Sequence, residues 1–129
     1  MAEKLKHRIL VVDDDESTRE CLAALLTSHG YEVSTAEDGF DALLQLTAAP
    51  PDVVISDLNM PGMSGFELLP VVRRVLPRTL LIAMSGGYEG EAVPEGVTAD
   101  AFVAKGEHPE RLLSATAQLI RASAAMASN

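Results

Sequence analysis

The sequence predicts an α/β domain in which a parallel sheet lies between helices. Short apolar runs alternate with segments of helical periodicity along most of the chain, and the connections between them are short. A length of 129 residues with 47% hydrophobic composition predicts one domain with one core. Short connections between strand and helix in each repeat indicate that the strands run parallel, because parallel neighbours need a helical crossover.

The apolar runs predict five buried strands. The first run, Ile9 to Val12, is apolar without alternation, which is typical of a strand covered on both faces. The predicted strands are residues 8–12, 31–35, 52–57, 79–84 and 101–104.

Four segments between the strands predict helices. Asp15 is a plausible N-cap for the first, and Gly30 ends it. In that helix Leu22, Leu25 and Leu26 share one face. The second helix is marked by Phe40, Leu43, Leu44 and Thr47 and ends before Pro50-Pro51. The predicted helices are residues 16–29, about 40–49, 64–76, and 109–121 or beyond.

Two segments depart from simple helical patterns. Pro70 falls inside the third helix and predicts a bend in a continuous helix, because proline removes one backbone hydrogen bond. The stretch 86–99 is rich in glycine and proline, so a helix there is expected to be short, irregular or mobile.

Composition restricts the class of partner and the compartment. Ten basic against 19 acidic residues give a net charge of −9, which argues against nucleic acid and anionic membranes. No run reaches the ~18 apolar residues of a membrane span, and the charged N-terminus does not resemble a signal peptide. The single Cys21 excludes an internal disulfide, fits the reducing cytoplasm and is expected to be a buried structural thiol.

Carboxylates follow two of the predicted strands. Asp13 and Asp14 come after the first strand, and Asp57 ends the third. If these strands are neighbours, their carboxyl ends gather negative charge in one crevice, and such a cluster suits a hard cation such as Mg²⁺. Ser85 and Lys105 stand at the ends of later strands and add a hydroxyl and an ammonium, so the set suits phosphoryl transfer onto a carboxylate.

The chain resembles the receiver domains of bacterial response regulators, the phosphoacceptor part of two-component signalling. The resemblance rests on the acidic doublet, on Asp57 followed by Met60-Pro61-Gly62, on Ser85, and on Phe102 to Lys105. It covers residues 7–122 and leaves residues 1–6 and 123–129 as short tails. It implies a doubly wound, flavodoxin-like sheet of five parallel strands in the order 2-1-3-4-5, with the site at the carboxyl ends of the strands.

The resemblance also implies a role for each site residue. Asp57 would accept a phosphoryl group from a histidine kinase or a phosphotransfer protein. Mg²⁺ would be held by Asp13, Asp14, Asp57 and the backbone carbonyl of Asn59.

Three further residues have implied roles around the phosphoryl group. Lys105 would pair with its oxygens, and Ser85 would donate a hydrogen bond to it. Phe102 occupies the position of the family's switch aromatic, which turns inward when the hydroxyl moves. A plain core role for Phe102 is nearly as well supported by its position at the end of a strand.

Two glycines depart from the family pattern. Gly106 stands where the family usually has proline, and Gly87 stands where a larger side chain often shields the phosphoryl group. Both are expected to ease the access of water and to shorten the lifetime of the phosphorylated state.

Three function classes follow. The first is a stand-alone phosphoacceptor that is not an enzyme, assists its own phosphorylation and slow dephosphorylation, and signals to an output protein as a monomer or weak dimer. The second is a pseudo-receiver that binds partners without phosphorylation. The third is an aspartate-nucleophile phosphatase similar to haloacid dehalogenases, because Asp13-Asp14-Asp15 comes near that family's motif, although the second acidic pair of that family is missing.

Overall fold

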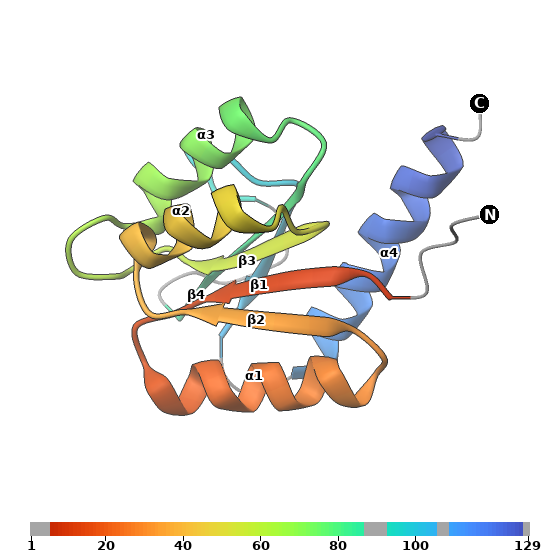
Figure 1. The fold of residues 1–129 in the computed structure, drawn as a ribbon, viewed down its shortest axis with the longest axis horizontal. Helices are drawn as coiled ribbons and strands as arrows, with labels where there is room; N and C mark the ends of the chain where they lie inside the picture. Colours follow the sequence, from red (N-terminus) through yellow and green to blue (C-terminus); the bar gives the residue numbers. More distant parts are fainter. Residues whose placement is uncertain (1–5, 87–92, 106–108, 128–129) are drawn as a thin grey trace.

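A five-stranded parallel sheet forms the centre of the molecule (Figure 1). The computed structural model describes residues 6–86, 93–105 and 109–127. The order of the strands is β2-β1-β3-β4-β5, as the sequence resemblance implied. The elements along the chain are β1 (Arg8–Val12), α1 (Glu16–Ser28), β2 (Glu32–Ala36), α2 (Gly39–Ala48), β3 (Val53–Asp57), α3 (Gly65–Val75), β4 (Leu80–Ser85), β5 (Ala101–Ala104) and α4 (Pro109–Ala127).

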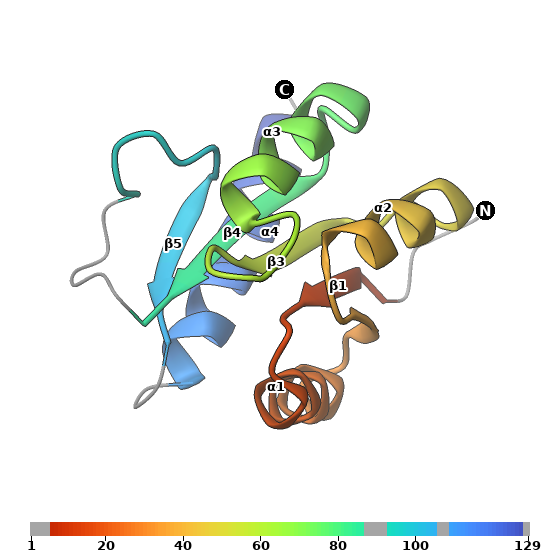
Figure 2. The ribbon, with the colours of Figure 1, turned by 90° about the vertical axis from the view of Figure 1, so that its left-hand side faces the viewer.

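The sheet is covered on both faces, so its central strands are apolar throughout. Helices α1 and α4 lie on one face, and α2 and α3 lie on the other (Figures 1 and 2). Alternate strand residues enter the two cores: Val11 and Ile55 pack with Leu26 of α1, whereas Val12 and Val54 pack with the α2 and α3 side. Both β1 and β3 are fully or almost fully buried along most of their length.

Strand boundaries differ from the predictions by about one residue. The amide of Tyr31 donates to the carbonyl of Leu26 and so belongs to the turn that ends α1. In the same way the amide of Thr79 donates to the carbonyl of Leu76 after α3, so β4 begins at Leu80. Gly30, at φ +92, supplies the left-handed conformation that ends α1, as predicted.

The two segments with irregular sequence patterns, around Pro70 and at residues 86–99, have different structures. Helix α3 continues through Pro70, as predicted. Between β4 and β5, the described residues 86 and 93–100 form no helix. No helix among the residues described is long and apolar enough to cross a membrane.

One burial prediction is wrong, and α2 exposes two of the apolar residues that mark it. Cys21 is exposed, because Leu22 and Leu26 fix the buried face of α1 and turn the thiol away from it. In α2, Phe40 and Leu44 are 60% and 73% exposed, because the small residues Gly39 and Ala42 occupy the side that meets the sheet.

Candidate functional site

The predicted site residues meet at the carboxyl edge of the sheet. Asp13 directly follows β1, and Asp57 ends β3, which is paired with β1 in the sheet. Ser85 ends β4 and Lys105 follows β5. Since all these strands are parallel, four separate segments of the chain deliver polar groups to one crevice.

The carboxylates of Asp13, Asp14 and Asp57 form a compact cluster. One oxygen from each lies within 4.8 Å of the others. Asp13 and Asp57 are buried, whereas Asp14 is exposed and leaves the cluster open to solvent.

The cluster fits a hard divalent cation. Asp13 Oδ2 is buried and lies 2.8 Å from the ammonium of Lys105. One ammonium offsets only part of the negative charge of this site, because three carboxylates share it. Three carboxylates with one side open to water are the donor set that Mg²⁺ prefers. The backbone carbonyl of Asn59 stays a predicted fourth ligand.

Lys105 lies between the two buried carboxylates. Its Nζ is 2.8 Å from Asp13 Oδ2 and 2.8 Å from Asp57 Oδ2. Partial burial lowers the pKa of Lys105, but the contacts with Asp13 and Asp57 outweigh this effect, and the net pKa lies above the ordinary 10.5. The ammonium is therefore charged at neutral pH and offsets the repulsion between the two aspartates.

The hydroxyl of Ser85 faces the loop that follows Asp57. Asn59 Nδ2 donates to Ser85 Oγ at 3.0 Å, and the amide of Asn59 donates to Asp57 Oδ1 at 3.1 Å. Asn59 thus contacts both the proposed phosphoacceptor and the hydroxyl beside it. The sequence suggested a role only for its carbonyl, because a side-chain contact across 26 residues leaves no local pattern.

Sequence reasoning also missed Arg19. Its Nη1 donates to the backbone carbonyl of Asp13 at 2.7 Å, so α1 holds the loop that carries the acidic pair. Asp15 caps α1 as predicted: its carboxylate accepts from the amide of Thr18 at 3.0 Å. Hydrogen bonds from the Thr18 hydroxyl and amide lower the pKa of Asp15. Asp15 is therefore a helix cap, and the acidic cluster contains only the first two residues of the triplet.

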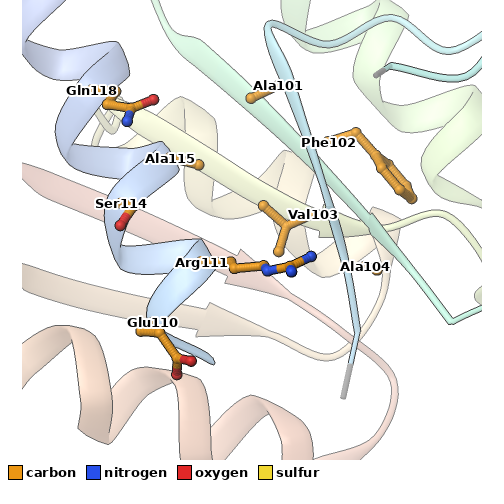
Figure 3. A pocket seen from close by; sticks show the side chains of 9 residues that line it. All are labelled: Ala101, Phe102, Val103, Ala104, Glu110, Arg111, Ser114, Ala115 and Gln118. Carbon is orange, nitrogen blue, oxygen red and sulfur yellow. The ribbon is translucent and has the colours of Figure 1, made fainter. Parts of the chain in front are cut away.

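Phe102 is 3% exposed and packs in the core shared with α2 and α3. In Figure 3 its ring points to the side of β5 opposite α4, whereas Val103 points toward the helix. A pocket of about 350 Å³ lies between β5 and α4, lined on the helix by Glu110, Arg111, Ser114, Ala115 and Gln118. This pocket is separate from the acidic cluster. The burial of the ring agrees with a core role, and a switching role stays a prediction.

Gly87 and Gly106 lie outside the described residues. The expectation that they shorten the lifetime of the phosphorylated state therefore stays a prediction.

Known proteins match the chain in sequence. A model of the response regulator receiver domain matches residues 9–117. Response regulator PleD of Caulobacter vibrioides is 43% identical over 84 residues, which cover 61% of this chain and 18% of PleD. Regulatory protein AtoC of Escherichia coli is 35% identical over 96 residues, which cover 74% of this chain and 21% of AtoC. The chain therefore spans about a fifth of the length of these relatives.

Solved structures agree with these matches. Chemotaxis protein CheY4 of Vibrio cholerae superposes with a TM-score of 0.78 at 36% identity, over 88% of this chain and 98% of CheY4. Response regulator TrrA of Thermotoga maritima, solved in complex with Mg²⁺ and BeF, superposes with a TM-score of 0.80 at 34% identity, over 88% of this chain and 98% of TrrA. With its parallel sheet, its acidic cluster and a family match over residues 9–117, the chain belongs to the response regulator receiver domains.

Proposed function

We propose that the protein is a phosphoacceptor and that Asp57 is its nucleophile. The observation that carries this proposal is the position of Lys105 Nζ, 2.8 Å from both Asp57 and Asp13 within an open acidic cluster. An ion pair that only stabilises the fold needs one carboxylate for Lys105. The further carboxylates of this cluster add electrostatic repulsion, which folding alone does not require.

The donor would be the phosphohistidine of a histidine kinase or of a phosphotransfer protein. An oxygen of Asp57 attacks phosphorus, the new O–P bond forms, and the P–N bond breaks with its electron pair leaving on the imidazole. Asp13, Asp14 and Asp57, with the Asn59 carbonyl, would hold Mg²⁺, which when bound neutralises charge on the transferring oxygens.

The chain's own groups complete the site. Lys105 stays protonated and can turn from Asp57 toward a phosphoryl oxygen without leaving Asp13, because it already contacts both. Ser85 is buried at the end of β4 and is oriented by Asn59, so its hydroxyl can donate to the same group. We propose that these new contacts shift the domain toward a state that binds an output protein.

The test is labelling with acetyl phosphate and Mg²⁺, followed by intact mass measurement and site mapping. We expect one phosphoryl group on Asp57, no uptake in EDTA, and no uptake by Asp57→Asn. Asp52→Asn is the matched control, since it removes one charge from a residue adjoining the opposite end of β3. A folded wild type that takes up no phosphoryl group from acetyl phosphate or a kinase would favour the pseudo-receiver alternative.

A further inference from the structure

Helix α2 presents two large apolar side chains to solvent. Phe40 is 60% exposed and Leu44 is 73% exposed. They are four residues apart and therefore adjacent on one side of the helix. Ala42 and Leu46 bury the other side against the sheet. We call the exposed side, formed by Phe40 and Leu44, the Phe40–Leu44 face.

This face borders the loop that follows the phosphoacceptor strand. A methyl group on Gly62 would lie 3.6 Å from Cε2 of Phe40, so the ring lies close to the backbone of that loop. A methyl group on Gly39 would lie 2.8 Å from Cβ of Met63, so the start of α2 packs tightly on the same loop. The Phe40–Leu44 face is thus fixed next to residues 60–63, a few positions after Asp57.

The surroundings of the face are acidic. Helix α2 and the turn before it carry the carboxylates of Glu37, Asp38 and Asp41 and contain neither lysine nor arginine. Exposed Glu37 precedes α2, exposed Glu67 lies in the first turn of α3, and Asp41 is partly exposed in α2. The whole α2 layer near the site therefore combines apolar side chains with negative charge.

This combination selects the kind of partner. An acidic surface repels nucleic acid and anionic membranes. It also disfavours a second copy of this chain that presents the same face, since like charges would then meet. A partner with apolar groups flanked by lysine or arginine satisfies both parts of the surface.

We propose that the Phe40–Leu44 face docks a basic amphipathic helix of a partner protein. Apolar side chains at helical spacing would pack against Phe40 and Leu44, and the flanking cations would pair with the carboxylates around Glu37 and Asp41. This contact does not require phosphorylation of Asp57. It is thus independent of the proposed function.

The test uses two synthetic helical peptides and the isotopically labelled protein. One peptide has leucine on one face and lysine on the other, and its control has glutamate at every lysine position. In amide NMR titrations, we expect the lysine peptide to shift the resonances of α2 and of residues 60–63. We expect the glutamate peptide to shift none of them at the same concentration.

Substitutions then locate the contact. We expect the double variant Phe40→Ser/Leu44→Ser to bind the lysine peptide about tenfold more weakly or worse, the loss typical of one or two apolar anchors. Val75→Ser is the matched control, because Val75 is 62% exposed near the other end of α3, and it should bind as the wild type does. Both variants should keep wild-type labelling by acetyl phosphate, since neither changes the acidic cluster.

Three results would overturn the proposal. The first is equal affinity of the wild type and the double variant for the lysine peptide. The second is a set of shifts confined to α1 and α4. The third is a concentration-dependent dimer of the wild type, seen by sedimentation and lost in the double variant, because the face would then be a self-interface.

Discussion

Asn59 Nδ2 donates a hydrogen bond to Ser85 Oγ across 3.0 Å. In this bond the hydroxyl oxygen acts as acceptor. The bond also joins the loop after β3 to the end of β4. The residue that follows the phosphoacceptor by two positions therefore aims the hydroxyl that is proposed to contact the phosphoryl group.

The first prediction is a slower uptake of phosphoryl groups in Asn59→Ala. A net hydrogen bond of about 1 kcal/mol corresponds to a rate change of about fivefold. Ser85→Ala should slow the reaction at least as much, because it removes the hydroxyl itself. Rates would be measured with acetyl phosphate and saturating Mg²⁺.

The double variant distinguishes orientation from independent effects. If Asn59 acts through Ser85, the double variant should be no slower than Ser85→Ala alone. If the double variant were instead slowed by the product of the two single effects, Asn59 would act on the reaction by another route.

The second prediction concerns Mg²⁺ and stability. A cation that binds only the folded cluster stabilises it by linkage, on the order of 1–3 kcal/mol at saturating metal. Thermal melts at neutral pH should therefore shift upward with Mg²⁺ in the wild type. The shift should shrink in Asp13→Asn, which keeps the size of the side chain but removes one buried charge. It should also weaken as the pH falls, because protons compete for the same carboxylates. An equal shift in both proteins would remove Asp13 from the metal ligands.

The third prediction follows from the raised pKa of Lys105. A pKa that is higher in the folded than in the unfolded state contributes stability that is fully present below the unfolded value. That stability is lost as the pH rises through the folded value. The unfolded pKa is near 10.5, so the loss should fall above that pH.

Urea unfolding without metal would check this sign. Between about pH 9 and about pH 11.5, the free energy of unfolding of the wild type should fall more steeply than that of Lys105→Met. The comparison cancels the other lysines and the tyrosines, which titrate in both proteins. Parallel pH profiles would mean that the ion pairs of Lys105 do not stabilise the fold.

Much of the site could be predicted because the sheet is parallel. Unbroken apolar runs such as Ile9 to Val12 mark strands buried on both faces, and parallel strands place all their carboxyl ends at one edge. Asp13 and Asp57 are 44 residues apart, yet each follows or ends such a run. Their meeting therefore follows from the topology alone.

What could not be predicted depends on helix rotation and on long-range contacts. The apolar pattern predicts helix α2 without fixing its rotation, and in the structure Gly39 and Ala42 are buried while Phe40 and Leu44 face solvent. The same rotation decides that Cys21 is exposed while Leu22 beside it is buried. The contact of Arg19 with the Asp13 carbonyl depends on where α1 begins relative to the loop that carries Asp13. The periodic pattern of apolar residues does not predict such a contact.

The last prediction concerns Gly65, the first residue of α3. A Cβ at this position would collide with the backbone oxygen of Asp57 and would lie 2.8 Å from Cα of Leu58. The amide of Gly65 also donates to the carbonyl of Leu58 at 3.2 Å, so α3 begins directly against the end of β3. Because the neighbouring atoms are backbone, they cannot move aside without displacing Asp57.

Gly65→Ala should therefore lower both stability and the rate of phosphorylation. Overpacking of this kind costs about 1–3 kcal/mol in the free energy of unfolding. Gly86→Ala is the matched control, because a Cβ there meets no atom of the other described residues within 4 Å, and its stability should stay within about 0.5 kcal/mol of the wild type. Urea melts and acetyl phosphate labelling of both variants would check this. If Gly65→Ala kept wild-type stability and rate, the close approach of α3 would not be what positions Asp57.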